Sequence, residues 1–239
     1  MMKVGRVISE LFYPSGIKCV ICGDDIPGYD RYAVCNKCEL SHNTKYCLRC
    51  GRAIKNMANY CDYCQNHEYA FDIARAPFVY ENEVVNLVHK LKYGGGKYLA
   101  EVMAEFMADE YYESDFAADV ITFVPMHPKK QRKRGYNQAR EIAVALSQIL
   151  EIPLSDALER TKLTENLARL GKEERAEAIQ NAILLKPEAD VKGKNVLLVD
   201  DVFTTGATSN ECAKALRKGK CGKIFVLTFA TGRIHVELY

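Results

Sequence analysis

The sequence lacks any long hydrophobic run. In its 239 residues, no apolar stretch approaches the roughly 20 residues that a helix needs to span a bilayer. Residues 1–6 do not form the apolar segment of a secretory signal peptide. The formal net charge is only +2, so overall charge gives no argument for attraction to nucleic acids or membranes. We therefore expect a cytoplasmic protein without a transmembrane segment.

Two familiar nucleotide-binding motifs are also missing. The sequence has no Gly-x-x-x-x-Gly-Lys-Ser/Thr loop and no Gly-x-Gly-x-x-Gly spacing. A phosphate site in this chain must therefore differ from that of a P-loop NTPase and from that of a dinucleotide-binding domain.

Cysteine is absent between residues 65 and 211, and eight of the ten cysteines lie before that gap. They form four Cys-x-x-Cys pairs, which are Cys19 and Cys22, Cys35 and Cys38, Cys47 and Cys50, and Cys61 and Cys64. Cytosolic thiols stay reduced, so disulfides are not expected. Because each pair can supply half of a tetrahedral Zn²⁺ site, four pairs predict two sites. Four thiolates close a site to water, so this zinc should be structural.

The four Cys-x-x-Cys pairs, called knuckles below, can combine into two zinc sites in two ways. A sequential arrangement joins the first two pairs and the last two pairs, whereas a cross-braced arrangement interleaves them. The sequential arrangement closes shorter loops, and we favour it for that reason. The cross-braced arrangement remains open.

Residues 196–208 carry the most chemical information. Four apolar residues, Val196 to Val199, precede Asp200 and Asp201, and a loop of small and hydroxyl-bearing residues follows. The apolar run predicts a buried strand of a parallel sheet, and the segment from Ala207 has helical spacing. A loop between a strand and a helix N-terminus presents free backbone N–H groups to an anion. The residues expected to bind phosphate there are Thr204, Thr205, Gly206, Ala207 and Thr208. Carboxylates beside such a cradle suit ribose hydroxyls or a divalent metal, so the stretch predicts a phosphorylated sugar with Mg²⁺.

The rest of the chain alternates strands with helices, which predicts βαβ units and an α/β fold with a central parallel sheet. Strands are expected at 75–81, 120–124, 196–199 and 224–230, and helices at 3–13, 83–91, 98–112, 137–150 and 207–218. Pro77 predicts that the first strand lies at an edge. The change of composition near residue 70 divides the chain into residues 1–70, an N-terminal helix with the zinc module, and residues 71–239, the α/β domain.

A basic segment follows the strand that ends at Val124. Lys129, Lys130, Arg132 and Arg134 occur there with no acidic residue between them. Alone, such a run would indicate a solvated loop. Because ligands of open α/β sheets bind beyond the carboxyl ends of the strands, we expect it to contact a second anion, such as pyrophosphate.

The acidic pair followed by Thr-Thr-Gly-x-Thr resembles the PRPP-binding signature of type I phosphoribosyltransferases. Val-Pro-x-His-Pro at 124–128, Arg-Gly-Tyr-Asn-Gln-Ala at 134–139 and Leu-Lys-Tyr-Gly-Gly at 91–95 resemble the ComF family more closely. That family combines a type I phosphoribosyltransferase fold with a double zinc-ribbon module. The resemblance implies a pyrophosphate loop after Val124 and a mobile catalytic loop from Arg160 to Asn181. It also implies a homodimer, by analogy with the superfamily.

Two functions follow from this resemblance. The first is an enzyme that transfers phosphoribose from PRPP to a nitrogen acceptor and releases pyrophosphate, with Asp200 and Asp201 as catalytic residues and Mg²⁺ bound with PRPP. The second is a PRPP-responsive, DNA-binding component of DNA uptake and natural transformation. Its partners would be single-stranded DNA or proteins of the competence machinery. Neither the acceptor nor the oligomeric state can be deduced from the sequence.

Overall fold

A sheet of five parallel strands forms the centre of the protein in the computed structural model, which describes residues 17–26, 31–54, 58–93, 95–162 and 182–233. The strands are β1 (Ile73–Arg75), β2 (Phe78–Val79), β3 (Val120–Phe123), β6 (Val196–Phe203) and β7 (Ile224–Thr231). Their order is β1-β7-β6-β3, and β2 also pairs with β7. Every pairing in this sheet is parallel, as the alternating pattern predicts.

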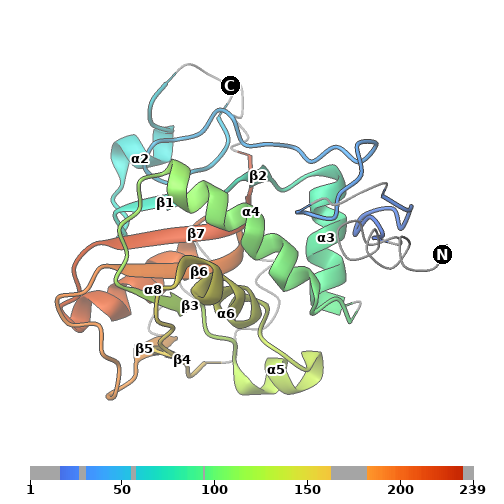
Figure 1. Ribbon diagram of the computed structural model, residues 1–239. Helices are drawn as coiled ribbons and strands as arrows, with labels where there is room; N and C mark the ends of the chain where they lie inside the picture. Colours follow the sequence, from blue (N-terminus) through green and yellow to red (C-terminus); the bar gives the residue numbers. More distant parts are fainter. Residues whose placement is uncertain (1–16, 27–30, 55–57, 94, 163–181, 234–239) are drawn as a thin grey trace.

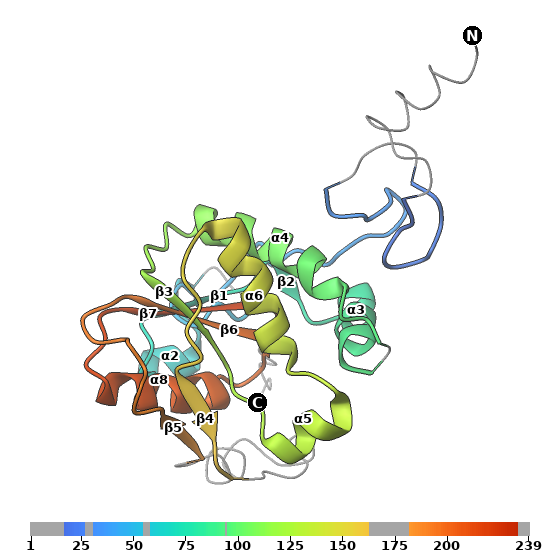
Figure 2. The same cartoon turned by 60° about the horizontal axis from the view of Figure 1, so that its bottom comes forward.

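Helices cover both faces of the sheet (Figures 1 and 2). The elements are α2 (Asp62–Asn66), α3 (Asn82–Tyr93), α4 (Leu99–Glu113), α5 (Pro128–Arg134), α6 (Gln138–Leu150) and α8 (Ala207–Lys218). α4 and α6 pack together over one face, and α8 packs on the other face. Amphipathic spacing explains this placement, because α6 buries Ile142 and Leu146 while α8 buries Cys212 and Leu216.

The strand expected at the edge of the sheet is divided into two short strands. Residues 75–81 were expected as one strand, but β1 ends at Arg75 and β2 begins at Phe78. Pro77 has no N–H for the ladder, so it lies in the break between the two. The expected helix at 3–13 lies outside the described residues.

Four elements were not expected, namely α2, α5, β4 and β5. The basic segment after Val124 is not a loop, because residues 128–134 form α5. Pro128 occupies the first turn of this helix, and the ring of His127 accepts a hydrogen bond from the amide of Lys129. A small two-stranded antiparallel sheet, formed by β4 (Leu158–Arg160) and β5 (Ile183–Leu185), packs against α8.

Residues 41–54, which include the third knuckle, cover the edge of the sheet. The amide of Ala74 donates to the carbonyl of Arg49 at 2.8 Å, and the amide of Val79 donates to that of Ser41 at 2.7 Å. Gly51 allows this approach, since its φ is 67° and an added Cβ would lie 2.5 Å from the carbonyl oxygen of Ala74. These contacts protect backbone groups that an edge strand would otherwise expose. The domain boundary at residue 70 remains a prediction.

Candidate functional site

Asp200 and Asp201 lie near the carboxyl end of β6, in the middle of the sheet. Asp200 pairs with Thr228 of β7, so its backbone is fixed by the ladder. One carboxylate oxygen of Asp200 accepts the amide of Asp201 at 2.9 Å, and one of Asp201 accepts that of Val202 at 3.0 Å. Both side chains are thus oriented by backbone amides, and β6 extends three residues past Asp200 to Phe203.

Lys92 is the cation that faces this acidic pair. Its ammonium nitrogen lies 2.6 Å from Oδ2 of Asp201, and both side chains are largely buried, with 23% and 13% exposure. Lys92 lies in the last turn of α3, which ends at Tyr93. The sequence ends the expected helix at residue 91 and gives no sign of the partner of Lys92.

Burial and neighbouring charges shift the pKa values of Asp200 and Lys92. Burial and the neighbouring charge of Asp201 raise the pKa of Asp200 well above its ordinary value, and the charge of Lys92 opposes this. Burial alone would lower the pKa of Lys92, but the attraction of Asp201 and Asp200 outweighs it and raises that pKa. The single positive charge of Lys92 therefore balances only part of the negative charge of Asp200 and Asp201. The two carboxylates suit a further cation or hydroxyl donors.

The loop at 204–208 joins β6 to α8 and is shaped by Gly206. This glycine is the N-cap of α8 with φ 78°, and an added Cβ would lie 2.5 Å from Cζ of Phe203. The hydroxyl of Tyr69 donates to the carbonyl oxygen of Thr205 at 2.9 Å and fixes the loop from the other side. The amide of Ala207, the first of α8, donates to the hydroxyl oxygen of Thr205 at 3.4 Å, and Thr204 is exposed. The amides that follow in the first turn of a helix have no partner within the helix. The five residues expected to bind phosphate thus occupy one loop at a helix N-terminus.

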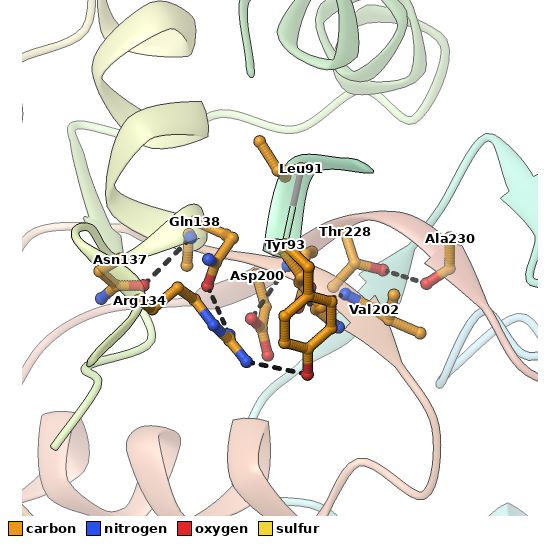
Figure 3. Close-up of polar contacts among 12 residues, drawn as sticks. Leu91, Tyr93, Arg134, Asn137, Gln138, Asp200, Val202, Thr228 and Ala230 are labelled. Atoms are coloured by element: carbon orange, nitrogen blue, oxygen red, sulfur yellow. Dashed lines mark hydrogen bonds and ion pairs between the residues drawn. The ribbon is translucent and has the colours of Figure 1, made fainter. Parts of the chain in front are cut away.

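Arg134, one of the four basic residues expected to bind pyrophosphate, contacts the end of α3. Figure 3 shows its guanidinium between Gln138 and Tyr93. Its guanidinium donates to Oε1 of Gln138 at 2.9 Å and to the hydroxyl of Tyr93 at 3.2 Å, and it lies 5.0 Å from the centre of the Tyr93 ring. The other three, Lys129, Lys130 and Arg132, are exposed on α5.

Residues 134–138 connect the ends of three elements. The hydroxyl of Tyr136 donates to the carbonyl of Leu91 in α3. The amide nitrogen of Asn137 donates to the carbonyl of Val124 at 3.0 Å, and its oxygen caps α6 at the amide of Ala139. The Arg-Gly-Tyr-Asn-Gln segment therefore holds the last turn of α3, and with it Lys92, against the end of β3.

Most of the expected catalytic loop lies outside the described residues, which omit 163–181. Its first residue, Arg160, ends β4 on the side of α8. Burial lowers the pKa of Arg160, and the charges of Cys212 and Asp200 act against this. Arg160 therefore lies within electrostatic range of the acidic pair.

The eight clustered cysteines form two groups in sequential order. The first group contains Cys19, Cys22, Cys35 and Cys38, and the second contains Cys47, Cys50, Cys61 and Cys64. Within each group the ligand atoms lie within 4.8 Å of one another. Sulfurs of neighbouring knuckles, Cys22 with Cys35 and Cys50 with Cys61, are 3.7 and 3.8 Å apart. Four thiolates around Zn²⁺ at 2.3 Å would be about 3.8 Å apart, so both groups fit the metal.

The two groups differ in their surroundings. The segment of the first group lies at the periphery, where Lys90 of α3 donates to the carbonyls of Val20 and Ile21 (Figure 2). In the second group, Cys47, Cys50 and Cys61 are buried in the same hydrophobic core as Phe71 and Phe203. The sequence did not indicate this difference, because the same Cys-x-x-Cys spacing occurs in both groups.

Comparison with known proteins gives two family matches. A family model described as "Phosphoribosyl transferase domain" matches residues 137–237, and one described as "PHF5-like protein" matches residues 1–76.

In the described part of the chain, no helix combines the length and apolar character needed to cross a membrane.

Several curated proteins are similar along most of the chain. "Competence protein F" of Haemophilus influenzae is 28% identical, over 84% of this chain and 91% of its own length. "Competence protein ComFC" of Streptococcus pneumoniae is 26% identical, over 91% and 100%. "DNA utilization protein YhgH" of Escherichia coli is 25% identical, over 82% and 88%. Among solved structures, a purine phosphoribosyltransferase from Pyrococcus horikoshii matches 52% of this chain and 66% of its own, at 23% identity and a TM-score of 0.32.

Proposed function

Because the chain belongs to the ComF family and carries a type I phosphoribosyltransferase domain behind a cysteine-rich module, we propose that it binds PRPP and transfers the phosphoribosyl group to a nitrogen acceptor. The observation that carries the proposal is the juxtaposition of the acidic pair at 200–201 with the loop at 204–208. One site there offers carboxylates for a sugar and amides for a phosphate.

In the proposed complex, the 5′-phosphate of PRPP binds the loop at 204–208. The first amides of α8 and the hydroxyls of Thr204, Thr205 and Thr208 donate to its oxygens. Asp200 and Asp201 accept hydrogen bonds from the ribose hydroxyls. Lys92 pairs with Asp201, and Arg134 donates to Tyr93, the residue that follows Lys92, so we propose that both cations contact the pyrophosphate group.

The transfer breaks one bond and forms one. The acceptor nitrogen attacks C1 of the ribose, the bond between C1 and the pyrophosphate oxygen breaks, and that oxygen retains the electron pair. The acceptor nitrogen loses its proton to solvent or to a base. Positive charge develops at C1 as pyrophosphate leaves, and carboxylates close to the ribose stabilise it. Lys92 and Arg134 stabilise the departing negative charge.

A divalent cation fits this acidic pair, because Lys92 compensates its two carboxylates only partly. Mg²⁺ bound with PRPP would neutralise part of the pyrophosphate charge. Asp200 and Asp201 are the residues that would orient it, either directly or through the ribose hydroxyls.

The test of transfer is release of pyrophosphate from PRPP in the presence of Mg²⁺ and a panel of nitrogen bases. We expect release with at least one base and none without a base beyond slow hydrolysis. Tight binding of PRPP without release from any base would contradict the transfer and leave a PRPP-binding protein.

The second candidate is a DNA-binding function, which the names of the similar competence and DNA utilization proteins and the exposed helix α5 support. Three of its basic residues, Lys129, Lys130 and Arg132, are exposed on one short helix. Cations that neutralise DNA phosphates release counterions, so such binding weakens steeply with salt. Replacing all three by Gln should weaken binding to a single-stranded oligonucleotide and reduce its salt dependence. The matched control replaces Lys214, Lys218 and Lys220, and equal losses in both variants would contradict a role for α5.

A further inference from the structure

A cavity of about 690 Å³ lies between residues 32–46 and the C-terminal half of α4, away from the acidic pair at 200–201. Its walls include the aromatic rings of Tyr32, Tyr46, Phe78 and Phe106. Three acidic side chains of α4, Asp109, Glu110 and Glu113, also line it. In the described part of the chain its lining contains no lysine or arginine, and its volume is that of a site for a small organic ligand.

A guanidinium already binds one part of this acidic surface. Arg31 donates to Glu105 at 2.7 Å and to Asp109 at 3.0 Å, and its guanidinium carbon lies 5.5 Å from the centre of the Tyr32 ring. A second acidic pair, Glu110 and Glu113, lies immediately C-terminal on the same helix. Among the described residues, neither of these two forms an ion pair, whereas Glu105 and Asp109 both do.

The negative charge of Glu110 and Glu113 therefore has little positive charge beside it. Burial is the main factor that raises the pKa of Glu110, and the charge of Glu113 adds to it. The hydroxyl of Ser114, which donates to Glu110 at 3.1 Å, and the nearby charge of Arg75 act in the other direction. Arg75 uses one nitrogen to donate to the carbonyls of Leu48 and Ala74, and it lies over the Tyr46 ring.

Asn43 supplies an independent sign of a missing donor. Its side chain is 7% exposed and lines the cavity. The amide nitrogen donates to the carbonyls of Gly51 and Ala76 at 2.9 and 3.1 Å, which fixes the orientation of the amide group. Among the described residues, the oxygen Oδ1 has no hydrogen-bond partner, and it is buried from solvent. A buried acceptor without a donor costs stability, and a ligand with N–H groups removes that cost only where the cavity wall moves to expose the oxygen.

We propose that this cavity binds an organic cation with several N–H donors, either a guanidinium or a primary amine. The cation contacts Glu110 and Glu113 and stacks on the aromatic walls. The same kind of contact already exists nearer the N-terminus of α4, where the guanidinium of Arg31 binds Glu105 and Asp109 and lies over the ring of Tyr32. Cation–π contact and paired carboxylates both favour a guanidinium over a neutral group of the same shape.

Two probes of nearly equal shape test the proposal, namely arginine methyl ester and the ureido analogue citrulline methyl ester. Calorimetric titration of the full-length, zinc-loaded protein should show at least tenfold tighter binding of the arginine ester. In the double variant Glu110→Gln and Glu113→Gln, its affinity should fall at least tenfold. The control Glu101→Gln, an exposed position on the same helix, should leave the affinity unchanged. Equal affinity for the two esters, or an unchanged affinity in the double variant, would overturn the proposal.

Spermidine and the peptide acetyl-Gly-Arg-Gly-amide then distinguish the two sources of such a cation. Tighter binding of the peptide, sensitive to the same double variant, assigns the cavity to an arginine of a partner protein. Tighter binding of spermidine assigns it to a free polyamine. If neither these two probes nor the arginine ester binds, the cavity is not a cation site.

Discussion

The ammonium nitrogen of Lys92 lies 2.6 Å from Oδ2 of Asp201, and this ion pair joins the last turn of α3 to the central strand β6. Leu91, the residue before Lys92, accepts a hydrogen bond from Tyr136, so three separate sequence motifs meet at one place. The pair keeps a positive charge beside two acids in the absence of ligand. In the proposed complex, the same lysine faces the pyrophosphate group.

Replacing Lys92 by Met should weaken both the fold and PRPP binding. The substitution leaves Asp201 without its counter-ion in a largely buried place, which costs about 1–3 kcal/mol of unfolding free energy. The loss of a contact to pyrophosphate should weaken PRPP binding by about tenfold, or about 1.4 kcal/mol. Urea unfolding and calorimetric titration measure the two effects. Lys218→Met, at an exposed position of α8, is the control, and an unchanged PRPP affinity in Lys92→Met would contradict the role given to Lys92.

The stability of the unliganded protein should decrease as pH rises above the ordinary pKa of an aspartate. The pKa of Asp200 is raised in the fold, so between the unfolded and folded values the native state holds more protons than the unfolded state. The contribution of Asp200 is therefore complete below its unfolded pKa and is lost as pH rises through its folded pKa. Asp200→Asn should flatten this slope in urea unfolding between acidic and neutral pH. Asp190→Asn should not, and a slope that persists in Asp200→Asn would assign it to another group.

Substitution of Gly206 by Ala should disturb the phosphate loop. The new Cβ would meet the ring of Phe203 at 2.5 Å, and the φ of 78° is unfavourable for alanine. We expect a loss of about 1–3 kcal/mol in unfolding free energy and a clear loss of affinity for ribose 5-phosphate. Gly193→Ala is a matched control, because its φ is 73° and nothing lies within 4 Å of the added Cβ. If both variants retain the affinity for ribose 5-phosphate, the loop does not bind the phosphate.

Loss of the second cysteine group should destabilise the protein far more than loss of the first. Cys61 is buried in the core of the sheet domain, whereas Cys22 is exposed. Cys61→Ser should lower the unfolding free energy of the sheet by about 2 kcal/mol or more, because it loosens the metal and buries a hydroxyl in an apolar core. Cys22→Ser should cost less than about 1 kcal/mol. Thermal unfolding with measurement of bound zinc tests this, and equal losses would mean that both groups support the sheet alike.

Most of the fold follows from local patterns in the sequence. The buried runs at 196–199 and 224–230 predict β6 and β7 because parallel central strands are apolar on both faces. The helix expected at 207–218 has the bounds of α8, since its apolar residues recur at helical spacing. Helix α5 was not expected, because a run of basic residues carries no apolar periodicity and its N-terminal signals are only Pro128 and the ring of His127.

The parts of the site that depend on distant contacts could not be derived from local patterns. Lys92 meets Asp201 only because Tyr136 and Arg134 hold the end of α3, and no spacing in the sequence encodes that contact. Likewise, nothing in the Cys-x-x-Cys spacing indicates that the second group joins the core. The hydroxyl of Tyr69, which fixes Thr205, belongs to a segment that separates the two predicted domains.

The central claim is that Asp200, Asp201 and the loop at 204–208 form a PRPP site. The most direct test is calorimetric titration of PRPP with and without Mg²⁺, in the native sequence and in the double variant Asp200→Asn with Asp201→Asn. The account predicts that Mg²⁺ strengthens binding to the native protein and that the double variant binds at least a hundredfold more weakly, or about 2.7 kcal/mol. A PRPP affinity that is unchanged in the folded double variant would contradict the assignment of this site.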